Sequence, residues 1–186
     1  MDCSHKHSKY HAPEAVVACI IENKNHQVLF LRQSKWGNKW VIPGGHIRGR
    51  LKSQISSNFP PIDETLFDAV KREVEEETGF KIYPHEIDFV APFVVTYPKG
   101  YCHSAYFVGI VYHVIPENSS PINIDIESDT YVWGNLFFTD NDGVVAMNGD
   151  EDLPLTDWTQ KVLRLWYSFK QSKGSLKKYI KYMQKL

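Results

Sequence analysis

A chain of 186 residues is long enough for one domain with small additions. Hydrophobic residues make up 42% of it and aromatic residues 13%, which excludes an intrinsically disordered protein. The formal net charge of −1 excludes a strong overall field that would draw the protein to nucleic acid or to an anionic membrane.

The N-terminal stretch 1–12 is polar and lacks the apolar centre of a secretory signal, so we expect a flexible segment there. The apolar run between Glu14 and Glu22 is too short to span a bilayer. Three cysteines are too few and too scattered for a disulfide framework. These features predict a cytoplasmic protein without a membrane partner.

The first elements predicted along the chain are two strands. Residues 15–21 are apolar and β-branched, and residues 27–32 form a second run of this kind. Residues 23–26 between them read Asn-Lys-Asn-His, which is turn chemistry. This pattern predicts a β-hairpin over residues 15–32.

A short extended segment, a long loop and a helix are predicted next. Trp40 to Ile42 is extended and ends at Pro43-Gly44-Gly45, and the polar residues 46–62 then predict a loop. We predict a helix over about 63–78, with Asp63 as its N-terminal cap. Gly79 follows the helix as a typical C-terminal glycine.

The second half of the chain predicts further strands and one strong helix. The strands are expected at 88–96, 104–114 and near 131–138, and the helix at about 156–171. Strands mixed with two or three helices indicate an α/β (α+β) sandwich. We expect the domain to cover 13–172, followed by a basic C-terminal helix or tail over 173–186.

Acidic residues of the predicted helix point in a direction that is unusual for solvated charges. An α-helix turns by about 100° per residue, so with Leu66 at zero, Val74 lies at about 80° on the apolar stripe. Glu77 falls at about 20°, inside the stripe, and Glu73 falls at about −20°, beside Leu66. Charged residues are normally found on the opposite face of such a helix.

Glu76 lies on the flank next to Glu73, so three carboxylates share one edge of the buried face. Buried carboxylates are costly and repel one another, and a divalent cation between them removes both problems. Mg²⁺ prefers carboxylate oxygens and also contacts substrate phosphates. The alternative is an acidic solvated face paired with Lys71 and Arg72, and the helical wheel by itself leaves both interpretations open.

The stretch from Glu64 to Phe80 resembles the Nudix box. Glu64 is followed by seven residues and then by Arg-Glu-Val-Glu-Glu-Glu-Thr-Gly-Phe, which matches every constrained position of the second part of that motif. Trp40 to Ile47 is similar to the segment that leads into the box. The resemblance covers about residues 14–140 and implies an α/β/α sandwich around a mixed central sheet.

One feature departs from the family pattern. Eighteen residues separate Gly45 from Glu64, where the family has five, so the chain carries an insertion at about 47–62. Extra length in a loop costs little stability, and the helix spacing is intact. The insertion does affect the expected shape of the site entrance, and with it the substrate.

The resemblance implies Mg²⁺, or Mn²⁺ in its place, bound by box glutamates together with a glycine carbonyl. The matching residues are Glu73, Glu76, Glu77 and Gly44 or Gly45. Arg72 would orient the glutamates and act with them in catalysis, Glu64 would support Arg72, and Gly79 would let the chain leave the helix. The implied activity is hydrolysis of a phosphoanhydride bond in a nucleoside diphosphate linked to another group, such as a nucleoside triphosphate, dinucleoside polyphosphate, ADP-ribose or nucleotide sugar.

Substrate contacts are predicted more loosely. The residues that we considered for this role are Arg32, Trp40, Tyr97 and Glu151. Arg32 resembles a family position that contacts phosphate, and aromatic rings can stack on a base. Glu151, Asp150 and Glu127 are also alternatives for a general base from a later loop. The plain alternatives are a surface arginine, core aromatics and solvated loop acids.

Two other functions stay open at this point. From Lys161 onward the chain has eight basic residues and no acid, which would suit an RNA 5′-end pyrophosphohydrolase, although such a run is usually a solvated face. A non-catalytic nucleotide sensor on the same fold is the third hypothesis, but such relatives tend to lose the box glutamates. We favour a nucleotide partner over nucleic acid, and a monomer or homodimer.

Overall fold

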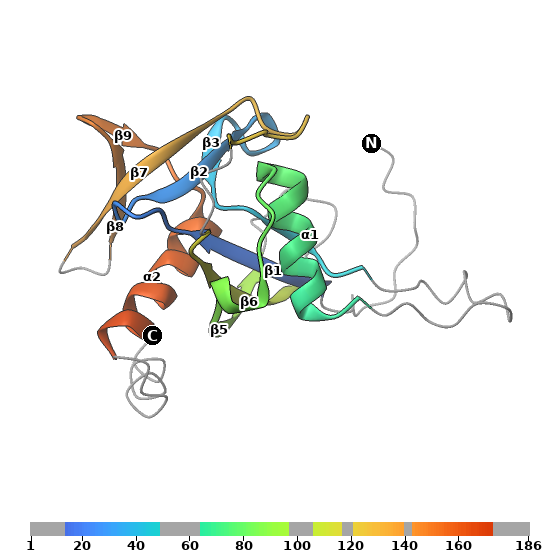
Figure 1. Cartoon of the computed structure of the whole chain (residues 1–186). Helices are drawn as coiled ribbons and strands as arrows, with labels where there is room; N and C mark the ends of the chain where they lie inside the picture. The colour runs from blue at the N-terminus through green and yellow to red at the C-terminus, as the bar shows by residue number, and fades with distance from the viewer. Residues whose placement is uncertain (1–13, 49–63, 97–105, 117–120, 140–142, 173–186) are drawn as a thin grey trace, which may run out of the picture.

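The structure is a computed structural model, and it describes residues 14–48, 64–96, 106–116, 121–139 and 143–172 (Figure 1). Its main elements are β1 (Glu14–Ile21), β2 (Val28–Gln33), β3 (Lys39–Val41), β4 (Gly44–His46), α1 (Leu66–Thr78), β5 (Ile87–Thr96), β6 (Tyr106–Val114), β7 (Thr130–Phe138), β8 (Val144–Asn148), β9 (Glu151–Leu153) and α2 (Asp157–Gln171). Two short 3₁₀ turns, η1 (Ser34–Trp36) and η3 (Pro84–Glu86), precede β3 and β5.

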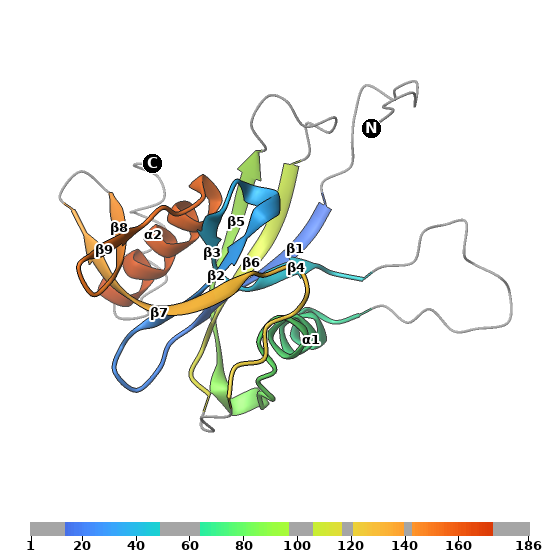
Figure 2. The ribbon, with the colours of Figure 1, turned by 90° about the horizontal axis from the view of Figure 1, so that it is seen from above.

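Two sheets form the framework (Figures 1 and 2). The first has the strand order β4-β1-β6-β5 and is mixed, because β1 and β6 run parallel while the other pairs are antiparallel. The second has the order β3-β2-β7-β8-β9 and is antiparallel throughout. Neither helix in the described part of the chain is long and apolar enough to cross a membrane.

Strand β1 is buried on both faces and separates two hydrophobic cores. Successive side chains of a strand point to opposite faces. Val17 and Cys19 therefore join the core cluster beneath α1, while Ala18 and Ile20 join the cluster that contains the buried side chains of α2. The mixed sheet thus has a helix on each side, which confirms the predicted sandwich.

The predicted hairpin over residues 15–32 is wrong, because β1 and β2 belong to different sheets. The turn itself forms, with an isolated bridge between Glu22 and Val28, but the strands then diverge. Beyond the bridge, β1 pairs with β4 and β6, and β2 pairs with β3 and β7. Strands that are apolar on both faces occupy central positions, and their neighbours here come from distant parts of the chain.

The helices and the remaining long strands follow the prediction, with one difference at a cap. Helix α1 begins at Leu66, and the hydroxyl of Thr65 accepts a hydrogen bond from the Asp68 amide at 3.1 Å, so Thr65 is the N-cap in place of the predicted Asp63. Gly79 ends the helix with a φ of 74°, as predicted. The predicted strands at 88–96, 104–114 and 131–138 are β5, β6 and β7.

The short strands β4, β8 and β9 were not predicted. The segments 1–12 and 173–186, most of the insertion and Tyr97 were also assigned from sequence, and they lie outside the described residues.

A buried carboxylate joins four elements at the end of β1. Glu22 is 2% exposed and accepts hydrogen bonds from His113 Nε2 on β6 at 2.6 Å, His26 Nδ1 in the turn at 2.7 Å and Lys170 Nζ on α2 at 3.0 Å. Burial acts to raise the pKa of Glu22, but these hydrogen bonds outweigh it and lower the pKa from 4.5 to about 2. Lys170 also lies over the Trp166 ring, 4.2 Å from its centroid, so Glu22 fastens the end of α2 to the mixed sheet.

Candidate functional site

The double glycine of β4 lies against the inward face of α1, where Glu73 and Glu77 are buried. Strand β4 pairs antiparallel with β1, with Gly45 opposite Val17. The Gly44 amide donates a hydrogen bond to Glu77 Oε2 at 2.8 Å. A Cβ on Gly45 would lie 2.4 Å from Glu73 Oε1, so glycine is required for this carboxylate to fit. The structure confirms that these two glutamates face the interior.

Burial makes both carboxyl groups weak acids. It raises the pKa of Glu77 from 4.5 to about 8, against the Gly44 hydrogen bond and with help from the charges of Glu73 and Asp125. Burial also raises the pKa of Glu73, although Arg72 opposes the shift. A divalent cation can take the place of such protons, because metal binding requires deprotonated ligands and stabilises them. Two hard oxygen donors beside the backbone of strand β4 therefore fit Mg²⁺ or Mn²⁺.

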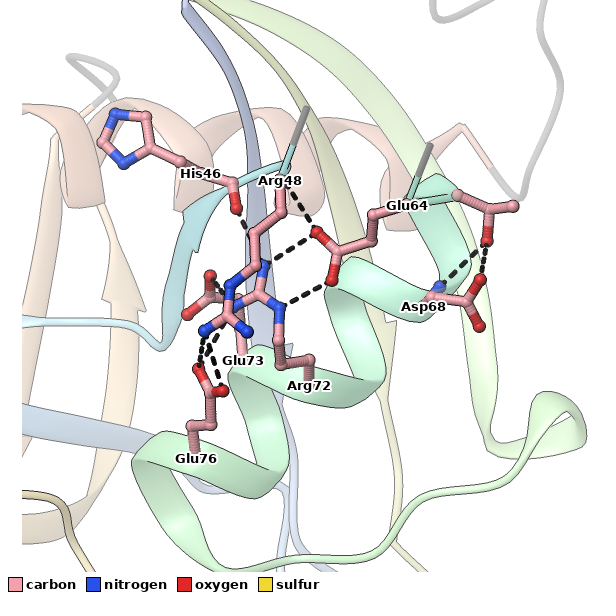
Figure 3. A network of polar contacts seen from close by, with 8 residues as sticks. His46, Arg48, Glu64, Asp68, Arg72, Glu73 and Glu76 are labelled. Atoms are coloured by element: carbon pink, nitrogen blue, oxygen red, sulfur yellow. Dashed lines mark hydrogen bonds and ion pairs between the residues drawn. The ribbon is translucent and has the colours of Figure 1, made fainter. Parts of the chain in front are cut away.

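Arg72 is the centre of the hydrogen-bond network in Figure 3. Its Nε and Nη2 donate to the two oxygens of Glu64 at 2.6 and 2.9 Å, and Nη2 also donates to the His46 carbonyl at 2.8 Å. Its Nη1 donates to Glu73 at 2.5 Å and to Glu76 at 3.1 Å. The hydrogen bonds from Arg72 lower the pKa of Glu64. One planar guanidinium thus positions three box glutamates and β4, which a lysine could not do.

Glu76 lies at the exposed edge of this network, with 47% of its side chain accessible. Arg48 Nη2 donates to both of its oxygens, at 2.9 and 3.2 Å. Among the residues that the structure describes, no three acidic, histidine or cysteine side chains converge as a complete metal-ligand set. Glu76 shares the Arg72 guanidinium with Glu73, but it is exposed, so it differs from the prediction that all three glutamates lie along the edge of the buried face.

Arg48 was missed by the sequence analysis, which treated its surroundings as loop. The indication in the sequence is a basic residue three positions after the double glycine, on the segment that leads out of β4.

The predicted substrate residues on the second sheet form a separate cluster. Arg32 on β2 is paired with Trp40 on β3, and the guanidinium carbon lies 5.9 Å from the Trp40 ring centroid. Arg32 Nε also lies 3.9 Å from Asp129 Oδ2. Glu151 is exposed on β9, opposite Asn148, and Figures 1 and 2 place this strand away from α1. The structure does not bring Glu151 together with the box glutamates.

The segment over residues 121–129 brings further acids toward α1. Asp125 is close enough to Glu77 for its charge to raise the pKa of that carboxyl group. Glu127 forms an ion pair with Lys35 of η1, whose charge acts on Glu77 in the opposite direction. Of the three acids considered as a base from a later loop, Glu127 therefore lies on the segment that reaches the site. Asp125 was not foreseen, because an acid in a polar connecting segment is common.

Comparisons with known proteins relate this fold and sequence to others. A model of the NUDIX domain matches residues 12–135. The m7GpppN-mRNA hydrolase NUDT17 of Danio rerio is 35% identical over 75 residues, which are 38% of this chain and 21% of that protein. The chain thus spans about a fifth of the length of this curated relative.

Two solved structures share the architecture. The MutT/nudix family protein from Enterococcus faecalis matches with a TM-score of 0.63 and 18% identity, over 91% of this chain and 65% of that chain. The MutT protein from Methanosarcina mazei Go1 matches with a TM-score of 0.56 and 22% identity, over 89% of this chain and 99% of that chain. At these identities the match shows a common fold.

Proposed function

The chain belongs to the Nudix family, and from this premise we propose that it hydrolyses a phosphoanhydride bond in a nucleoside diphosphate linked to another group. The observation that carries the proposal is the pair of buried carboxylates, Glu73 and Glu77, set against Gly44 and Gly45 of strand β4. A solvated acidic face would not bury them. The box glutamates are retained, which argues against a non-catalytic sensor.

We propose Mg²⁺, or Mn²⁺, as the cofactor, with Glu73, Glu76 and Glu77 as its ligands and a carbonyl of Gly44 or Gly45 beside them. When bound, such a cation neutralises phosphate charge and lowers the pKa of a coordinated water. The raised pKa values of Glu73 and Glu77, which burial causes first, support this assignment, because a bound cation would stabilise their charged forms.

The other residues of the site would position these groups. Arg72 fixes Glu73 through a charge-assisted hydrogen bond, and Glu64 holds Arg72 in a bidentate pair. The Gly44 amide orients Glu77. For the general base we favour Glu127, because it lies on the segment that reaches Glu77; its half-exposed carboxylate forms an ion pair with Lys35.

Arg32 is our proposed phosphate contact outside the box. Its side chain is 42% exposed and ends near Trp40, which is itself 8% exposed. A ring buried to this extent supports the guanidinium more readily than it stacks on a base. A second candidate function is hydrolysis at a capped RNA 5′ end, favoured by the likeness to the Danio rerio mRNA hydrolase and by the basic residues after Lys161.

The direct test is a Mg²⁺-dependent activity screen over nucleoside triphosphates, ADP-ribose, dinucleoside polyphosphates and capped RNA. We expect turnover with at least one of these that Glu76→Gln reduces by about 10²-fold or more, because a charged ligand is lost. Glu75→Gln is the matched control, since Glu75 is the exposed neighbour on the same helix and should behave like the wild type. Wild-type turnover by Glu76→Gln would remove Glu76 from the metal site.

Alanine substitutions at the two glycines of β4 should have different effects, one on activity and the other on stability. At Gly45 the new Cβ meets the Glu73 carboxylate, which can move, so we expect an intact fold with activity reduced by about 10-fold to 100-fold. At Gly44 the new Cβ would lie 2.4 Å from the Val17 carbonyl oxygen, and the φ of 155° adds strain, so we expect a loss of stability. Thermal melts and activity assays on both variants check this. Unimpaired activity in Gly45→Ala would show that the position of Glu73 does not matter.

A further inference from the structure

We propose that Arg48 is an internal counterion of Glu76 that competes with the divalent cation for this carboxylate, and so sets the metal affinity of the enzyme without substrate. The inference rests on the proposed function and extends it to a residue outside the box motif. It assigns Arg48 a positioning role, because Arg48 acts through Glu76.

The contact occupies the same oxygens that a metal would need. Arg48 Nη2 donates to Glu76 Oε1 at 2.9 Å and to Oε2 at 3.2 Å, and Arg72 Nη1 donates to Oε2 at 3.1 Å (Figure 3). Mg²⁺ and Mn²⁺ bind through such carboxylate oxygens at short distances. A cation can use Glu76 fully only after a guanidinium has moved away.

Of the two arginines, Arg48 is the one that can leave. Arg72 is 15% exposed and is held by Glu64, Glu73 and the His46 carbonyl, so its place is fixed by several partners. The Arg48 side chain is 64% exposed, and within the described part of the chain its side-chain hydrogen bonds go to Glu76. Metal binding therefore exchanges one positive partner of Glu76 for another.

The backbone around Arg48 is positioned independently of its side chain. The Ile47 amide donates to the Ala15 carbonyl at 2.9 Å, which continues the pairing of β4 with β1. The Arg48 amide donates to Glu64 Oε2 at 2.7 Å. Replacing the Arg48 side chain therefore removes the contact with Glu76 and leaves the chain path in place.

The test is a titration of the full chain with Mn²⁺ in the absence of nucleotide. The free Mn²⁺ is measured by its electron paramagnetic resonance signal. We expect Arg48→Gln to bind Mn²⁺ about threefold to fivefold more tightly than the wild type, the range that one exposed ion pair can supply. Arg48→Lys should fall between them, because lysine keeps the charge without the planar fork. The difference between wild type and Arg48→Gln should shrink at high salt, which screens exposed pairs.

Lys71→Gln is the control, because it removes one positive charge from the exposed face of α1 and should leave Mn²⁺ affinity unchanged. Equal or weaker Mn²⁺ binding by Arg48→Gln overturns the role of Arg48. If Glu76→Gln weakens Mn²⁺ binding in the same experiment, the proposed metal site survives that result. Absence of Mn²⁺ binding by the wild type overturns both proposals. Thermal melts show that each variant is folded.

Discussion

Replacing Glu77 by glutamine is expected to make the protein more stable when a chelator removes divalent metal. The same variant should be almost inactive when Mg²⁺ is present. Glu77 is 7% exposed, and burial raises its pKa from 4.5 to about 8. Between these two pKa values the folded state keeps a proton that the unfolded chain releases. The contribution of Glu77 to stability is therefore fully present below about pH 4.5 and is lost as the pH rises through about 8. The loss amounts to about 3 to 5 kcal/mol at high pH.

Glutamine has nearly the same shape and its carbonyl can still accept from the Gly44 amide, but it does not ionise. In urea titrations with a chelator, the free energy of unfolding of Glu77→Gln should stay level between pH 6 and about 9, while that of the wild type falls. Added Mg²⁺ should restore the free energy of unfolding of the wild type at high pH, because it binds the folded state. It should leave the free energy of unfolding of the variant unchanged. Activity should drop by about 10²-fold or more.

Glu75→Gln supplies the reference, since it makes the same chemical change on the exposed side of α1. If Glu77→Gln and the wild type lose stability in parallel as the pH rises, Glu77 does not hold a proton in the folded protein. If Mg²⁺ stabilises the variant as much as the wild type, Glu77 is not a ligand. Either result would require a different account of the buried pair.

The second large effect is expected on stability when Glu22 is replaced. Glu22 has no proposed role in hydrolysis, but it holds several elements of the fold together. Its pKa is lowered from 4.5 to about 2 by hydrogen bonds from His113, His26 and Lys170 that outweigh its burial. A depressed pKa means that the stabilisation is present above about pH 4.5 and is lost as the pH falls toward 2. The difference corresponds to on the order of 3 kcal/mol at neutral pH.

Glu22→Gln removes the charge while keeping the size of the side chain, so we expect about 2 to 3 kcal/mol of lost stability at pH 7. The variant should also lose much of the pH dependence of unfolding between about pH 4.5 and 2, measured by urea titration at several pH values. Asp88→Asn is a suitable control, because Asp88 pairs with His113 across β5 and β6 but is exposed. A stability of Glu22→Gln equal to that of the control would show that the ion pairs contribute nothing.

The parts of the fold that could be predicted are those with strong local patterns. Helix α1 has an apolar stripe and a C-terminal glycine, and β1, β5 and β6 are long apolar runs, so their positions follow from residues close together in sequence. The same local pattern misled at residues 15–32, because two apolar runs joined by a turn do not specify which strands become neighbours. That choice depends on distant segments, here β6 and β7.

The candidate site shows the same division. The wheel argument located Glu73 and Glu77 correctly, since helical geometry is regular. Strand β4 has two glycines and no β-branched residue, so only its pairing with β1 makes it a strand. The contact between Arg48 and Glu76 depends on that pairing, and the Glu22 cluster draws on a turn, two strands and a helix. Neither leaves a local pattern in the sequence.

The hydrogen bond from the Arg48 amide to Glu64 has a practical consequence. It draws the two ends of the inserted segment together, at 2.7 Å between donor and acceptor, and Arg72 anchors Glu64 from the other side. Closing a longer span adds only about 0.6 kcal/mol for each doubling of its length. A labelling peptide or an affinity tag spliced between Arg48 and Glu64 should therefore leave α1 in register with β4.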